Sequence, residues 1–133
     1  MAERKTYTAK EIAYGRRSTD EQVRAFLDLA AEGQISEGFE ATYFNNMALS
    51  LDRFFVHRLR SVIGNGTTPL NELELISEGL TSEGVLPEHD EIDYDPAKSV
   101  LGLKVGDPIE LSADQFVELS DAVFAELEAK FER

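Results

Sequence analysis

A single helical pattern runs from about Glu37 to Ile63 and limits the folds open to this chain more than any other feature. Its apolar residues, placed at about 100° per residue, fill one wide arc of the helix surface. Because several neighbours are needed to cover such an arc, we predict a central helix inside a helical bundle. A helix of this length would extend about 40 Å, so we also expect a bend near Asn45 and Asn46. The arc contains Phe44, Met47, Leu51, Phe54, Phe55, Leu59 and Val62.

Three further helices are indicated by capping signals at their N-termini. A Ser or Thr side chain accepts a hydrogen bond from the backbone N–H three residues on, and Glu or Gln at that position returns one. Pro is favoured at the first helical position, where no backbone donor is needed. The predicted starts are Ser18 with Glu21, Thr68 with Pro69, and Ser112 with Gln115, and the first of these helices is expected over residues 19–32.

Residues 1–17 are predicted to form a loosely attached N-terminal arm, and residues 18–133 a single helical domain. Within the arm, Thr8 with Glu11 indicates one short helical turn, which the pair Arg16-Arg17 is expected to end. A chain of 133 residues is long enough to bury one core and is most simply one domain.

The segment between the third and last helices is predicted to hold a small β-hairpin. Within residues 99–111, Val, Leu and Ile flank Gly106-Asp107-Pro108, which is turn chemistry. Leu101–Leu111 resembles the strand–turn–strand end of the AbrB/MazE type of DNA-binding swapped hairpin. We interpret this match as shared turn chemistry, because the upstream segment Glu88–Asp95 is acidic where that family is basic. The predicted fold class is therefore mainly α, a bundle-like domain around one long helix, with one hairpin.

The net charge of −13 lies entirely in the second half of the chain. Residues 1–66 hold nine Lys or Arg and nine Asp or Glu, whereas residues 67–133 hold four and 17. An acidic total opposes general nucleic-acid binding, since Lys and Arg supply most of the affinity for phosphates. The chain has no Cys, which excludes disulfides and thiolate metal sites. Without a signal-peptide pattern or a membrane-length apolar run, we expect a cytoplasmic protein with no membrane partner.

Arg53, His57 and Arg60 form the best candidate ligand-binding site. Their spacings of four and three place them on one helix face, where clustered cations favour an anion. A phosphate, a carboxylate ligand or an acidic protein surface would suit this stripe. The alternative is internal: acidic side chains from the second half pair with these groups inside the fold, because a central helix needs its charges satisfied.

The sequence favours neither a metal site nor catalysis. Glu91, Asp93 and Asp95 match the first, third and fifth positions of a calcium-binding loop. Pro96 and Gly102, however, stand where that loop needs a Gly and a bidentate Glu. A solvated acidic loop is therefore the preferred interpretation. We predict no metal, no cofactor and no catalytic residue.

We expect a non-enzymatic protein-interaction or assembly module that self-associates as a homodimer. A long aromatic-rich helix and a marginal hairpin would both need extra cover, which a second subunit supplies. A basic protein would also suit the acidic half as a partner. Two alternatives stay open: a small anionic-ligand-binding domain that uses the cationic stripe, and a nucleic-acid-linked regulator that binds DNA or mimics it.

Overall fold

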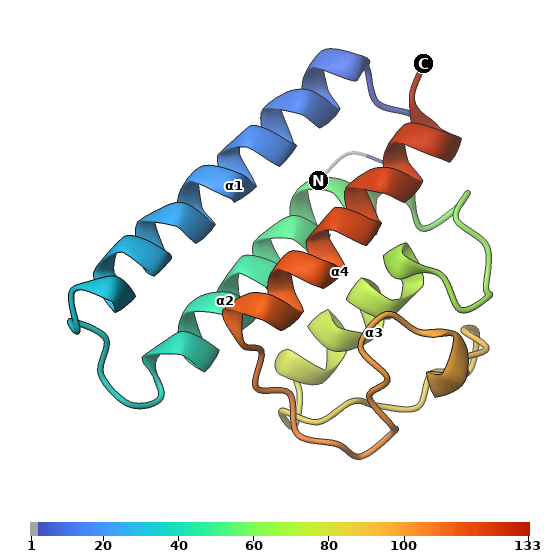
Figure 1. Cartoon of the computed structure of the whole chain (residues 1–133). Coiled ribbons are helices and arrows are strands. Elements are labelled where there is room, and N and C mark those ends of the chain that lie inside the picture. Colours follow the sequence, from blue (N-terminus) through green and yellow to red (C-terminus); the bar gives the residue numbers. More distant parts are fainter. Residues whose placement is uncertain (1–2) are drawn as a thin grey trace.

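Four α-helices organise the protein in the computed structural model, which describes residues 3–133 (Figure 1). These are α1 (Ala9–Ala31), α2 (Phe39–Leu51), α3 (Pro69–Leu80) and α4 (Ala113–Glu126). Shorter helical segments are the π-helix η1 (Asp52–Val56), the 3-10 helices η2 (His57–Leu59) and η3 (Pro96–Lys98), and the π-helix η4 (Leu127–Phe131). The mainly helical prediction is confirmed. The predicted hairpin is wrong, because residues 3–133 contain no strand.

The most enclosed helix is α3, not the long helix over residues 37–63 that the sequence indicated. Every residue of α3 from Leu70 to Gly79 is buried except Glu78. It packs against α2, η1 and α4. Thr68 caps the helix by accepting a hydrogen bond from the Asn71 N–H, as predicted. Because polar side chains are buried along with apolar ones, the hydropathy of α3 understates its central position.

Residues 39–59 form one continuous helical run, which changes from an α-helix to a π-helix at Asp52. Helix α2 begins at Phe39, after Gly38 in the left-handed region (φ 83°), which favours glycine. The expected bend near Asn45-Asn46 is wrong, since the irregular part is η1 followed by η2. A π-turn holds more residues than an α-turn and therefore changes the direction in which later side chains point. Phe54 is 54% exposed and Val62 38% exposed, although both belong to the arc that was predicted to be buried.

Helix α1 begins at Ala9, so the predicted helix start at Ser18 is wrong. Thr8 and Glu11 form a complete capping box, with hydrogen bonds of 3.2 and 2.9 Å. The helix continues through Arg16-Arg17 because Arg16 pairs with Asp121 (3.7 Å) and with Glu128 on the C-terminal helical run.

The segment that precedes α1 is part of the core. The side chain of Tyr7 is only 1% exposed. Its N–H donates to the Phe131 carbonyl (2.8 Å), and its own carbonyl accepts from the Arg133 N–H (2.9 Å). The beginning and the end of the described chain therefore lie side by side.

The predicted turn at residues 106–108 forms after α3. The chain at this turn pairs with Leu86 and not with residues 99–103. Asp107 N–H donates to the Lys104 carbonyl (2.9 Å), and Gly106 has a φ of 92°. The Leu86 N–H then donates to the Asp107 carbonyl (2.9 Å). Residues 99–103 cannot form the first strand, because the N–H groups of Val100 and Leu101 are already bound by a carboxylate from α3.

Helix α4 starts as predicted and is held to α2 at its first turn. Ser112 and Gln115 form both bonds of a capping box. The Glu40 carboxylate accepts from the Ala113 N–H (2.7 Å), which is a further orphan donor of the helix start. Asn45 binds the chain just before the helix, since its side chain accepts from the Leu111 N–H (3.1 Å).

Replacing Gly79 with Ala is expected to destabilise the protein by at least about 2 kcal/mol, because overpacking a closed site forces the backbone to move. A Cβ atom there would lie 2.2 Å from the Val85 carbonyl oxygen and 2.7 Å from Ile109 Cδ1. Urea unfolding measures the loss. Gly66→Ala is the control, since Gly66 has open space around it and no left-handed backbone. Equal stability of the two variants would contradict the close approach of residues 79 and 85.

Candidate functional site

A groove of about 540 Å³ runs between α1 and the run formed by α2 and η1. We call it the α1–α2 groove. Helix α1 contributes a row of side chains at spacings of three and four, which lie on one helix face. The facing row comes from the C-terminal part of α2, from η1 and from η2. The outward members of the two rows are Tyr14, Ser18 and Gln22 on α1, and Ser50, Phe54 and Arg58 opposite.

The Phe55 ring approaches α1 closely at Gly15, and both residues line the groove. A Cβ atom at Gly15 would lie 2.4 Å from the Phe55 ring, so only a glycine lets this ring reach α1. Phe55 also packs edge-on against Tyr7 (centroids 5.0 Å apart) and against Phe124 (5.6 Å). These aromatic contacts join α1, η1 and α4 beneath the groove and fix its depth.

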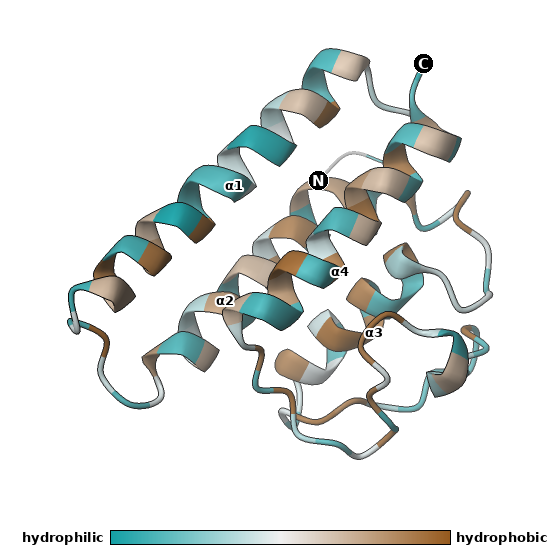
Figure 2. Cartoon of the chain, in the orientation of Figure 1, coloured by the Kyte–Doolittle hydropathy of each residue, from teal (hydrophilic) through white to brown (hydrophobic). Residues whose placement is uncertain are grey.

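Two large aromatic side chains face each other across the groove in a mostly solvated position. Tyr14 on α1 is 66% exposed and Phe54 on η1 is 54% exposed. Met47 and Leu51 line the groove between them. Figure 2 shows that the middle of α1 is mainly hydrophilic. Aromatic groups exposed together in a concave site are typical of binding surfaces.

The end of the groove nearest Tyr7 carries a cluster of charged groups. Arg4 donates to both oxygens of Glu11 (2.8 and 3.0 Å), and this pairing lowers the pKa of Glu11 to about 2. The Arg4 guanidinium also lies 4.7 Å from the centre of the Tyr7 ring. Arg58 lines the groove at the same end. The Arg4 backbone N–H donates to the Arg58 carbonyl (2.7 Å), so Arg4, Glu11 and Arg58 meet at this end of the groove.

Further cations follow the outer edge of α1 beside the groove. Lys10, Arg17 and Arg24 are all exposed and are spaced by seven residues, or about two turns. Arg17 lies 5.7 Å from the centre of the Tyr14 ring, which places it at the groove edge. Asp20 and Glu21 each lie three or four residues from both Arg17 and Arg24, and Asp28 lies four residues beyond Arg24. The outer edge of α1 therefore carries both cations and acids.

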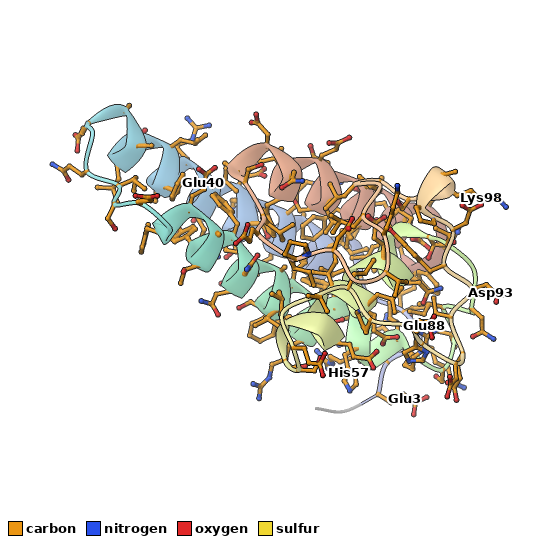
Figure 3. The ribbon with its side chains drawn as sticks, turned by 90° about the horizontal axis from the view of Figure 1, so that it is seen from below. Glu3, Glu40, His57, Glu88, Asp93 and Lys98 are labelled. Atoms are coloured by element: carbon orange, nitrogen blue, oxygen red, sulfur yellow. The ribbon has the colours of Figure 1, made fainter. Side chains whose placement is uncertain are left out.

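The structure separates the three residues of the predicted ligand-binding stripe. Arg53 and His57 are exposed, and Figure 3 shows His57 at the molecular surface. Arg60 instead turns towards α3, where it donates to Asn71 Oδ1 (2.9 Å) and pairs with Glu74. Internal pairing, the alternative interpretation of the stripe, thus applies to Arg60. Anion binding by Arg53 and His57 stays a prediction.

Several acids of the second half are buried, which the sequence did not reveal. The Glu72 carboxylate accepts from the N–H groups of Val100 (2.7 Å) and Leu101 (3.0 Å), and its burial raises its pKa. Glu126 accepts from the Leu70 N–H (3.1 Å) and from Lys130 Nζ (3.2 Å). Part of the acidic half is thus used inside the fold, where these two carboxylates bind backbone N–H groups.

Asp52, the first residue of the π-helix, is the most perturbed carboxyl group. Burial raises its pKa to about 7, and the neighbouring Glu74 carboxylate adds to the rise. The Ser77 hydroxyl lies close enough to lower the pKa somewhat. Among the described residues, however, neither Asp52 Oδ1 nor Ser77 Oγ has a hydrogen-bond partner. The charged form of the Asp52 carboxyl group therefore destabilises the folded protein.

The acidic loop after α3 gathers charges without forming a metal site. His89 Nε2 lies 3.7 Å from a Glu78 carboxylate oxygen, and His89 Nδ1 accepts from the Glu91 N–H (3.0 Å). Across residues 3–133, no group of three or more His or acidic side chains is placed to hold a metal ion. Figure 3 shows Asp93 and Lys98 at the outer edge of this region.

No protein-family model, curated protein or solved structure matches the chain. Within the described residues, none of the helices combines the length and apolar character needed to cross a membrane.

Proposed function

We propose that the protein is a non-enzymatic interaction module that binds another protein in the α1–α2 groove. One observation carries this proposal: Tyr14 and Phe54 stand on opposite sides of one groove, and each is more than half exposed. Aromatic side chains are enriched at protein interfaces and supply much of the binding energy there. Leaving two of them in water at one site is unfavourable unless a partner covers them.

The groove also has the shape that an interaction of this kind requires. Its apolar part is formed by Met47, Leu51 and the two aromatic rings, and its ends carry hydroxyl, amide and guanidinium groups. An apolar centre with a polar rim is the usual arrangement of a protein interface. The rigid contacts of Phe55 beneath the groove support a preformed site, which lowers the entropic cost of binding.

Affinity capture with the Tyr14→Ser/Phe54→Ser double variant tests this function. The parent protein is expected to retain a partner that the double variant loses, with at least a tenfold weaker affinity when the purified partner is titrated. Val105→Ser is the matched control, since Val105 is a 49% exposed apolar side chain outside the groove. Urea unfolding verifies that all three proteins are equally folded. Equal retention of every captured protein by the double variant and the control would contradict the proposal.

A further inference from the structure

We infer that the partner bound at this groove is a second copy of the chain, docked antiparallel across the α1–α2 face. By the α1–α2 face we mean the side of the molecule on which the α1–α2 groove opens. The inference rests on the proposed docking function and names the partner. Two features carry it: exposed apolar side chains lie at both ends of this face, and unpaired charges of opposite sign lie at the same two ends.

The exposed apolar side chains of the α1–α2 face form two clusters. Tyr14 and Phe54 form the first, which lies in the groove. Leu29, which is 41% exposed, and Phe39, which is 39% exposed, form the second, beside the connection between α1 and α2. A partner that covers only one of the two clusters leaves the other in water.

Helical spacing and ring contacts place the second cluster on the same face as the groove. Leu29 lies seven residues, or about two turns, after the groove residue Gln22, so both share one side of α1. The Phe39 ring packs beside Tyr43, with the ring centroids 5.8 Å apart. The Tyr43 hydroxyl in turn donates to the Gln22 carbonyl (2.8 Å). The apolar clusters therefore stand at the two ends of one continuous surface.

The distance between the clusters is the same on both helices. Tyr14 and Leu29 are 15 residues apart on α1, and Phe39 and Phe54 are 15 residues apart along α2 and η1, or about 22 Å in each case. Helices α1 and α2 run antiparallel (Figure 1). A two-fold axis through the middle of the face therefore lays the first cluster of each copy on the second cluster of the other. One surface thus supplies both halves of its own interface.

The charges at the two ends of the face are also self-complementary. Glu32 and Glu37 lie at the end with the second cluster, and Lys10 and Arg53 lie at the other end. All four are exposed, and among the described residues none of them forms an ion pair. The cations and acids in the middle of α1 offset one another at spacings of three and four. In the antiparallel dimer, the acids of each copy meet the cations of the other.

The α1–α2 face is large enough for a specific but weak dimer. Helix α1 has 23 residues and is therefore about 34 Å long, and two helices side by side are about 20 Å wide. A dimer across most of this surface buries about 1,200 Å² in total, which is the lower limit of stable protein interfaces. We therefore expect a dimer that dissociates on dilution.

Light scattering of the full chain over a dilution series tests the inference. The parent protein is expected to be a dimer at about 100 µM, because small interfaces give weak complexes. Tyr14→Ser/Phe54→Ser and Leu29→Ser/Phe39→Ser are each expected to raise the dissociation constant at least tenfold. Val105→Ser is the control, since Val105 is exposed outside the groove. Urea unfolding verifies the fold, and Leu29→Ser alone replaces the second pair if that variant is unfolded.

Complementary charge reversal tests the antiparallel arrangement. Glu32→Lys/Glu37→Lys and Lys10→Glu/Arg53→Glu are each expected to dimerise at least tenfold more weakly than the parent, since like charges then meet at both ends. An equimolar mixture of these two variants is expected to restore dimerisation, because a heterodimer brings opposite charges together at both ends. Lys98→Glu changes an exposed cation outside the groove and is expected to dimerise like the parent.

Several outcomes would overturn the inference. A parent protein that stays monomeric at about 100 µM has no dimer of the expected strength. A dimer that is unchanged in both Ser variants uses another surface, and a mixture of charge variants that does not recover contradicts the antiparallel arrangement. If the chain is monomeric but a captured protein depends on Tyr14 and Phe54, the dimer inference fails and the docking function stands. If neither a dimer nor a captured protein depends on these two residues, both proposals fail.

Discussion

Asp52→Asn is expected to stabilise the protein above pH 7, by about 4 kcal/mol at most, since one pKa unit corresponds to about 1.4 kcal/mol. The folded state raises the pKa of Asp52 from 3.8 to about 7, because burial and the adjacent Glu74 disfavour the charged form. The folded protein therefore binds more protons at this group than the unfolded chain does. Stability from this group is complete below about pH 4 and is lost as the pH rises to about 7.

The difference between the variant and the parent isolates this contribution. Urea unfolding from pH 4 to pH 8 is expected to show nearly equal stabilities at pH 4 and a growing advantage of Asp52→Asn up to pH 7. Above pH 7 the difference in stability between the variant and the parent is expected to stay constant. Asp20→Asn is the control, since Asp20 is exposed on α1 and is expected to show no such trend. A variant that is less stable than the parent at pH 8 would refute the assignment of a buried, destabilising charge.

Glu72→Ala is expected to destabilise the protein by about 3–5 kcal/mol, because each buried donor left without a partner costs about 1–3 kcal/mol. Glu72 is the acceptor for the N–H groups of both Val100 and Leu101, so the variant leaves two donors without it. Hydrogen exchange adds a local measurement. The amides of Val100 and Leu101 are expected to lose protection more strongly than amides of α1.

Glu78→Ala is the matched control, because Glu78 lies on the same helix but is exposed. Its effect on stability is expected to stay within about 0.5 kcal/mol. A loss below about 1 kcal/mol for Glu72→Ala, or unchanged protection at residues 100 and 101, would show that the carboxylate does not hold the segment after η3.

The sequence predicted those parts of the fold that depend on neighbouring residues. The starts of α3 and α4 follow from Thr68 with Pro69 and from Ser112 with Gln115, which act within one turn. The start of α1 carries an equally good capping signal at Thr8. The pair Arg16-Arg17 favours an early end to that helix in the sequence, whereas in the fold Arg16 is neutralised by acids of the C-terminal helical run.

The remaining errors come from contacts between residues distant in sequence. The wheel that grouped Arg53, His57 and Arg60 assumed a regular helix, but η1 changes the rotation and Glu74 draws Arg60 inwards. The hairpin failed because Glu72 binds the backbone of residues 100 and 101. In the sequence alone, Glu72 and Glu74 cannot be distinguished from exposed Glu residues.

The groove left a weak signal in the sequence. The row Glu11, Tyr14, Ser18 and Gln22 repeats at spacings of three and four but is too polar for a buried helix face. A single large aromatic residue in such a row indicates a face that is neither core nor ordinary surface. The opposite side of the groove could not be located from the sequence. The direction of its side chains depends on the change of helix geometry at η1.

The pairing of Tyr7 with Phe131 and Arg133 sets an order of events during synthesis. Helix α1 contacts α4 and η4, which the ribosome produces about a hundred residues later. Residues 4–18 therefore emerge about a hundred residues before the surface that receives them. Until then the nascent chain exposes Tyr7 and Ile12, which the finished protein buries. Tyr7 therefore gains its two backbone partners only once residues 131 and 133 have been made.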